Sequence, residues 1–110
     1  MIKVTIKRTA QGLIESFTMN GHASFAEHGQ DLVCAGASAV SFGSINAIVA
    51  LTNVMPEIDQ GGDGGFLRCV IPKDLSEDTE EKVQLLLEGM LISLETIEKD
   101  YGNYIKITNK

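Results

Sequence analysis

No charged residue occurs between Leu32 and Val54. The run is long enough to cross a membrane as a helix, because about 20 apolar residues suffice for a span. Serine, threonine and asparagine side chains lower its hydrophobicity, however, and no Lys or Arg cluster flanks it. Its larger apolar residues recur at helical spacing. We therefore expect a helix that is buried in a protein core, and no membrane segment.

Small residues recur at every fourth position of this run, at Ala35, Ala39, Gly43 and Ala47. Positions that are four apart lie on the same face of a helix. A ridge of small side chains lets another element approach the helix backbone closely. We expect this ridge to serve tight packing in the core.

The N-terminal part of the chain shows the alternation that is typical of β-strands. Residues 2–8 alternate apolar with polar side chains, which predicts a strand with one buried face. A turn follows, and a second strand should end near Asn20 and Gly21. One face of this second strand is expected to carry Leu13, Glu15, Phe17 and Met19. The two strands predict an antiparallel hairpin.

A second hairpin is expected near the middle of the chain. The glycine-rich residues 61–65 provide its turn, and residues 66–72 form its later strand. In that strand Cys69 lies on the same face as Leu67 and Ile71. We therefore expect Cys69 to be buried and chemically inert.

Ser76 and the acidic residues that follow it mark the start of a second helix, because the hydroxyl can cap it and the acidic side chains suit its dipole. Apolar residues then repeat at spacings of three and four until Asp100 or Tyr101. Residues 104–108 form a last strand. The chain is expected to fold as one domain, residues 1–110, with the α+β architecture of a two-layer sandwich: two main helices on one face of a mostly antiparallel sheet.

Cys34 follows Asp31 by three positions. If Asp31 caps the first helix, Cys34 lies in its first turn beside unpaired N–H groups. Helix N-termini stabilise the thiolate, which is the nucleophilic form of cysteine. Ser38 lies one turn further on the same face, where its hydroxyl could bond near the thiol or satisfy a backbone carbonyl. Cys34 is thus a candidate nucleophile, with an inert, packed thiol as the alternative.

His22 stands just before the loop that joins the second strand to this helix. A neutral imidazole beside the thiol can accept its proton and later protonate a leaving amine. Asp31 either orients this histidine or only caps the helix, and the sequence does not rank these roles. The loop is bounded by Gly21 and Gly29, either of which could act as a hinge. His28, in the same loop, is the alternative base.

The sequence argues against several other classes of site. No close pair of ligands such as C-x-x-C or H-x-x-x-H occurs, so we expect no metal, and no helix start follows the glycine-rich turn, so we expect no nucleotide cofactor. With 9 Lys and Arg against 15 Asp and Glu, the net charge of -6 disfavours nucleic acid and favours a basic partner. The chain opens as a strand without a secretory leader, which predicts the reducing cytoplasm.

Two segments, NGHA at 20–23 and DLVCAGAS at 31–38, resemble the signature blocks of the ribosomal-processing cysteine protease family, called Prp. The resemblance extends over all 110 residues. It implies a small homodimeric α+β protein that removes a short N-terminal extension from the large-subunit ribosomal protein numbered twenty-seven. The resemblance places the family's histidine on His22 and its cysteine on Cys34. The aspartate and serine of the second block fall on Asp31 and Ser38, whose roles it does not fix.

This resemblance selects peptide hydrolysis among the possible thiol reactions. Cys34 is expected to attack the scissile carbonyl, and His22 to activate the water that releases the acyl-enzyme. The acidic charge suits a ribosomal protein, which belongs to a basic class. The loop from Gly21 to Gly29 is expected to close over an extended peptide. The main alternative is a non-enzymatic adaptor that binds a basic ribosomal or nascent protein, with Cys34 merely packed.

Overall fold

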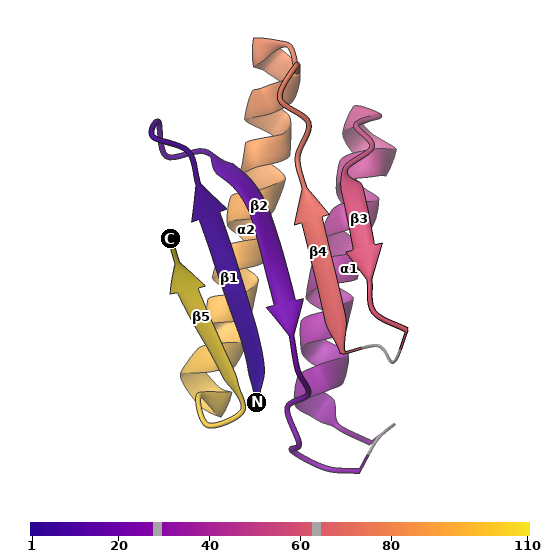
Figure 1. Ribbon diagram of the computed structural model, residues 1–110, viewed down its shortest axis with the longest axis vertical. Coiled ribbons are helices and arrows are strands. Elements are labelled where there is room, and N and C mark those ends of the chain that lie inside the picture. The colour runs from indigo at the N-terminus through magenta and orange to yellow at the C-terminus, as the bar shows by residue number, and fades with distance from the viewer. Residues whose placement is uncertain (28–29, 63–64) are drawn as a thin grey trace.

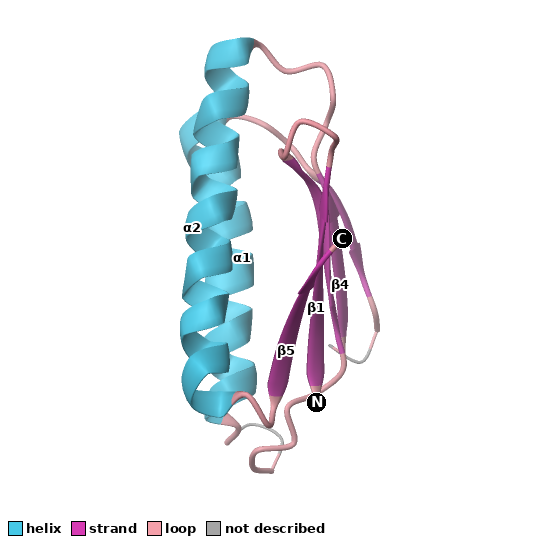
Figure 2. Cartoon of the chain, turned by 90° about the vertical axis from the view of Figure 1, so that its left-hand side faces the viewer, coloured by secondary structure: helices cyan, strands magenta, loops and turns pink. Residues whose placement is uncertain are grey.

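The computed structural model describes residues 1–27, 30–62 and 65–110, and in these ranges two helices cover one face of a single sheet (Figure 1). Seen from the side, the helices form one layer and the strands the other (Figure 2). The elements are β1 (Ile2–Arg8), β2 (Ile14–Asn20), α1 (Leu32–Thr52), β3 (Glu57–Gln60), β4 (Phe66–Val70), α2 (Glu77–Tyr101) and β5 (Ile105–Asn109). The predicted two-layer α+β sandwich is confirmed.

The five strands are arranged in the order β3-β4-β2-β1-β5. Three neighbouring pairs are antiparallel, and the pair of β1 and β5 is parallel. β1 and β2 form the predicted first hairpin, and β3 and β4 form the second, whose turn contains Asp63 and Gly64 outside the described residues. Strands β3 and β5 are the two edges of the sheet.

The register of β1 and β2 shifts once within the hairpin. Lys7 stands opposite Ser16, but the next residue, Arg8, stands opposite Ile14. The extra residue, Glu15, is a β-bulge, and a bulge reverses the alternation of side chains beyond it. Phe17 and Met19 are buried as predicted, whereas Leu13 and Glu15 do not continue their face; Ile14 enters the core instead.

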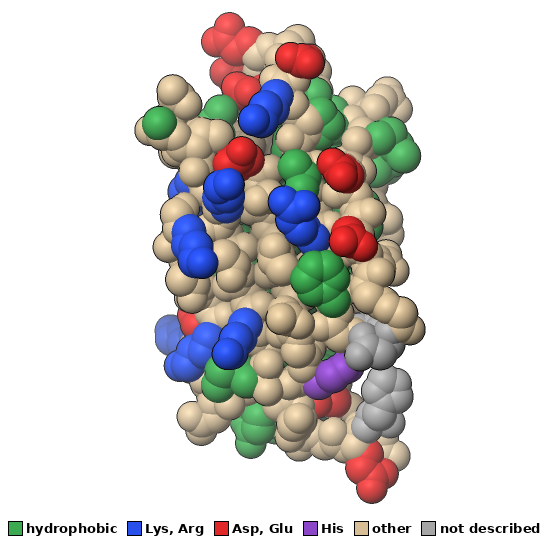
Figure 3. All heavy atoms as spheres, in the orientation of Figure 1, with side chains coloured by type: hydrophobic (Ala, Val, Ile, Leu, Met, Phe, Trp, Pro, Cys, Tyr) green, Lys and Arg blue, Asp and Glu red, His purple; other side chains and the backbone are tan. Residues whose placement is uncertain are grey.

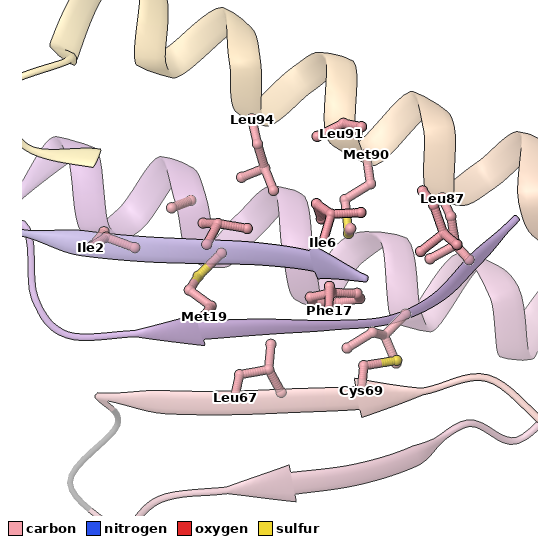
Figure 4. Close-up of a cluster of buried hydrophobic side chains, with 14 of the residues drawn as sticks. Ile2, Ile6, Phe17, Met19, Leu67, Cys69, Leu87, Met90, Leu91 and Leu94 are labelled. Atoms are coloured by element: carbon pink, nitrogen blue, oxygen red, sulfur yellow. The ribbon is translucent and has the colours of Figure 1, made fainter. Parts of the chain in front are cut away.

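The hydrophobic core lies between the sheet and the helices. Side chains from three strands meet side chains from α2 there (Figure 4). Ser76 caps α2 as predicted, because its hydroxyl accepts a hydrogen bond from the Thr79 N–H at 3.2 Å. The residues labelled in the figure are Ile2, Ile6, Phe17, Met19, Leu67, Cys69, Leu87, Met90, Leu91 and Leu94.

Helix α1 is less buried than its uncharged sequence suggests. Its buried positions are Val33, Ala37, Ser41, Ile45 and Ile48, a single stripe toward the core. The ridge of small residues lies on a different face, where three of its members are exposed and only the fourth is half-buried. The expectation that this ridge packs in the core is therefore wrong. By length and composition α1 could also span a membrane, and 28% of its most apolar window is buried inside the protein.

Candidate active site

The first turn of α1 is built on the side chain of Asp31. Its backbone is extended, with φ of -84° and ψ of 105°, as an N-cap requires. The Oδ1 atom accepts a hydrogen bond from the Cys34 N–H at 3.0 Å. The predicted cap is confirmed, and it places Cys34 at the positive end of the helix dipole.

The sulfur of Cys34 has a main-chain hydrogen-bond donor of its own. The Ala23 N–H, from the loop that follows β2, points at Cys34 Sγ at 3.2 Å. This contact fixes the sulfur relative to the loop that follows β2. Cys34 is only half-buried, so its position is also accessible to solvent.

Asp31 also holds the loop in place. Its second oxygen, Oδ2, accepts a hydrogen bond from the Phe25 N–H at 2.9 Å, and its side chain is 8% exposed. Burial acts to raise the pKa of Asp31, but hydrogen bonds from the amides of Cys34, Phe25 and Ala26 and from the Cys34 thiol outweigh it, so the pKa is lowered. The carboxylate therefore ties the helix start to the loop, in addition to capping.

The predicted site residues meet at one cavity of about 670 Å³. His22, Asp31, Cys34 and Ser38 all line it, His22 from the loop after β2 and Ser38 from the second turn of α1. Its apolar wall consists of Ile2, Met19, Phe42, Phe66 and Leu67. A cavity of this size and mixed lining is suited to a ligand with both polar and apolar groups.

Ser38 is exposed at this cavity. Within the described ranges its hydroxyl makes no hydrogen bond, whereas Ser41 and Ser44 bond the carbonyls of Ala37 and Val40 at 2.8 and 2.6 Å. Of the two readings of Ser38, satisfaction of a backbone carbonyl is thus not the one that the structure adopts.

Gly21 is a fixed contact point. Its φ is +95°, and a Cβ there would overlap the Met1 carbonyl oxygen. Its N–H donates to the carbonyl of Gly65, just before β4, at 2.8 Å. The residue that precedes His22 is thus held between two other segments. Gly29 and His28, the other loop residues singled out, lie outside the described residues.

Replacing Gly21 with alanine should destabilise the protein by roughly 1–3 kcal/mol and lower kcat/KM, because both the left-handed backbone and the overlap with Met1 displace the segment that carries His22. Gly12→Ala is the matched control, since Gly12 has a φ of +87° but open space around its Cβ position. Gly12→Ala should lose less stability than the Gly21 variant and keep its activity. Equal loss of kcat/KM in both variants, measured with a peptide substrate beside thermal unfolding, would argue against this role of Gly21.

Two contacts in the loop were missed by sequence reasoning. One is the Ala23 amide, since a main-chain donor leaves no mark in the residue type. The other is Phe25, whose ring packs edge-on against Tyr101 and Tyr104 with centroid separations of 5.6 and 5.1 Å. The only available signal was an aromatic residue in a polar loop of a chain with 5% aromatic residues. These rings fasten the loop to the C-terminal end of α2.

Cys69 lies in the core and is 0% exposed, as predicted. Burial raises the pKa of its thiol to about 11. Among the described residues, no group of three His, Cys, Asp or Glu side chains could hold a metal ion.

Iodoacetamide should therefore alkylate Cys34 in the folded protein at neutral pH, and Cys69 at least about 100-fold more slowly, since the thiolate is the reactive form. Peptide mapping by mass spectrometry separates the two sites. Addition of denaturant should bring the two rates together. Similar rates in the folded protein would contradict the assigned environments.

Comparison with known proteins gives a consistent result. The sequence profile of the family described as "Cysteine protease Prp" matches residues 1–106. The ribosomal processing cysteine protease Prp of Bacillus subtilis is 51% identical over 108 residues, which cover 98% of this chain and 96% of that protein. The protein of the same name from Staphylococcus aureus is 43% identical, and the alignment covers 100% of both chains.

Two crystal structures of the Staphylococcus aureus ribosomal processing protease Prp are similar to this fold. The structure with a covalently linked product peptide has a TM-score of 0.91 at 43% identity. The structure with a substrate peptide has a TM-score of 0.84 at 40% identity. Both comparisons cover 100% of each chain.

Proposed function

The chain belongs to the Prp family of cysteine proteases, and from this membership we infer that it removes an N-terminal extension from a ribosomal protein precursor. Its relatives from Bacillus subtilis and Staphylococcus aureus, which are ribosomal processing proteases, support a role in ribosomal processing. The finer assignment, to the large-subunit ribosomal protein numbered twenty-seven, rests on the resemblance of the segments around His22 and Cys34. Membership of a protease family sets aside the non-enzymatic adaptor.

We propose that Cys34 is the nucleophile and His22 the base and proton donor. The observation that carries this assignment is the position of Cys34 at the first turn of α1, with the Ala23 N–H on its sulfur and His22 at the same cavity. His22 takes the thiol proton, and the sulfur attacks the scissile carbonyl. The imidazolium then protonates the leaving amine, and His22 activates the water that hydrolyses the acyl-enzyme.

The proposal extends to the setting in which the enzyme works. We propose a cytoplasmic homodimer that uses no cofactor and binds neither nucleic acid nor a membrane. Large apolar side chains that are more than half exposed on the two helices support association of two copies: Leu32, Leu51, Leu85 and Ile92. Sedimentation analysis of the purified protein should give a mass of two chains.

Incubation with a peptide that spans an extended ribosomal-protein N-terminus tests the function. Mass spectrometry should find one cut, at the junction of the extension and the mature protein. The acidic net charge predicts that cleavage weakens as salt is raised, because screening reduces the attraction of a basic peptide. Absence of any cut in the extended peptide, with an enzyme whose Cys34 is reactive, would overturn the proposed substrate class.

A further inference from the structure

The two edges of the sheet differ in how their outward main-chain groups are covered. At the β5 edge, the Ile107 N–H donates to the Glu98 carboxylate at 2.8 Å, so a side chain from α2 occupies the outward main-chain donor. Such covering is a common way to block an edge against further strands. The other edge, β3, is a strand of four residues, all of which are exposed.

The pairing of β4 determines which groups of β3 face outward. Gly21 N–H bonds the Gly65 carbonyl, and Ile71 N–H bonds the Glu15 carbonyl, so the odd-numbered residues of β4 point toward β2. On the other side, Gly61 N–H bonds the Phe66 carbonyl at 3.1 Å. In an antiparallel ladder bonded and non-bonded pairs alternate.

Continuing this alternation along β3, Asp59 opposite Arg68 is a bonded pair, whereas Gln60 and Ile58 form the non-bonded pairs. The main-chain N–H and C=O groups of Ile58 and Gln60 therefore point to the free edge. These outward groups have the spacing that is needed to form hydrogen bonds with a further strand.

This edge leads into the cavity that contains Cys34. Gln60, at the end of β3, and Gly61 both line that cavity, together with Phe42 of α1. Ile58 and Gln60 stand opposite Cys69 and Leu67, which are buried, so their side chains lie on the core side of the sheet. Ile58 is nevertheless 37% exposed, which leaves an apolar surface beside the open edge.

The outer side of the same edge is acidic. Glu57 and Asp59 are exposed there, and acidic side chains gather along the right-hand margin of the sheet's outer face (Figure 3). Basic side chains are spread over the rest of that face, and Arg68 of β4 stands opposite Asp59 (Figure 3). The side chains of β3 itself, two acidic and none basic, suit basic residues in a peptide placed on its free side.

We propose that an extended segment of the substrate adds to β3 as a further strand, and that this pairing delivers the scissile bond to Cys34. In such a segment, alternate side chains would lie against Ile58 on the core side and beside Glu57 and Asp59 on the outer side. The preferred segment alternates apolar with basic or polar residues. This inference rests on the proposed function, since it describes how the same site selects its peptide.

N-methylation of the peptide tests the pairing without changing the enzyme. In a peptide that adds to an edge strand, every second N–H pairs with the protein. Methylation of those amides, one at a time, should raise KM about three- to tenfold each, and methylation of the intervening amides should have little effect. If KM responds to N-methylation outside the scissile residues but the response does not alternate from one amide to the next, the proposal is wrong.

A pair of proline variants tests the same point on the protein. Ile58→Pro removes an outward N–H from the β3 edge, and Ile107→Pro removes an outward N–H from the β5 edge as a matched control. The readout is the ratio of kcat/KM for a long peptide to that for the shortest peptide that is cut. Ile58→Pro should reduce this ratio at least about fivefold, whereas Ile107→Pro should preserve it.

The outcomes separate this inference from the proposed function. Failure of the wild-type enzyme to cut any ribosomal-protein peptide would overturn the proposed function itself. Cleavage with an unchanged ratio in Ile58→Pro would overturn only the pairing with β3. A variant that becomes monomeric while its ratio is unchanged would show that a second copy of the chain, and not substrate, occupies this edge.

Discussion

Replacing Cys34 with alanine should lower kcat for peptide cleavage by at least about 10⁴-fold, because the acyl-enzyme cannot form without the sulfur. The fold should tolerate the change, since Cys34 is only half-buried and alanine suits a helix. Single-turnover assays with excess enzyme measure the loss, and thermal unfolding checks the fold. Cys69→Ala is the control: it should lose stability through a cavity in the core but keep its kcat below the unfolding transition.

The partnership of Cys34 with His22 adds a second measurement to the same experiment. Groups that act as one catalytic unit show strongly non-additive losses. The double variant Cys34→Ala, His22→Ala should therefore be no slower than the more damaging of its two single variants. Multiplicative losses would mean that the two side chains act independently, and residual cleavage within tenfold of wild type in Cys34→Ala would exclude it as the nucleophile.

The second large effect is expected at Asp31, where two variants separate two roles. Asp31→Ala removes both the helix cap and the loop contact, and should destabilise the protein by about 1–3 kcal/mol. Asp31→Asn keeps an oxygen for the Cys34 N–H but places an amide NH₂ opposite the Phe25 N–H, which then has no acceptor. It should retain most of the stability and still lose about ten- to a hundredfold in kcat/KM, because the loop that bears His22 and Ala23 is displaced.

If Asp31 only caps the helix, Asp31→Asn should have nearly normal activity at temperatures where it is folded. If activity falls in proportion to stability in both Asp31→Ala and Asp31→Asn, the role of Asp31 in placing the loop is likewise contradicted. Hydrogen exchange of the Ala23 and Phe25 amides gives a readout that a mere cap would not change, since both amides should lose protection in Asp31→Asn.

The pH dependence of stability should change with the same residue. The pKa of Asp31 is lowered in the folded protein, so its carboxylate stabilises the fold at neutral pH, and that contribution is lost as pH falls from about 4 through the folded-state pKa. Urea unfolding between pH 7 and pH 2 should show a shallower decline in Asp31→Asn than in wild type. Parallel curves would contradict the assigned hydrogen bonds.

Much of the fold and part of the site could be predicted from sequence, because both depend on local patterns. A few adjacent residues suffice to recognise each of these patterns. Examples are the alternation in residues 2–8 and the helix caps at Asp31 and Ser76. Cys34 and Cys69 could be told apart for the same reason, since one follows a cap and the other shares a face with aliphatic residues.

The features that could not be predicted depend on contacts between distant segments. The bulge at Glu15 is a matter of register between two strands, and nothing in the residue type demands it. The exposed ridge on α1 follows from the direction in which the helix faces the sheet, which spacing alone does not fix. The Ala23 amide reaches Cys34 only because Asp31 and Phe25 fix the loop, so the geometry of the site arises from tertiary structure.

The parallel pairing of β5 with β1 has a consequence for folding during synthesis of the chain. These strands are neighbours in the sheet but far apart in the sequence, so their pair forms only after the segments between them have been translated. Contacts of such wide sequence separation form slowly, and this pair cannot form while β5 remains in the ribosomal exit tunnel. A nascent chain should therefore stay incompletely folded, with the β5-facing edge of β1 unpaired, until β5 has emerged.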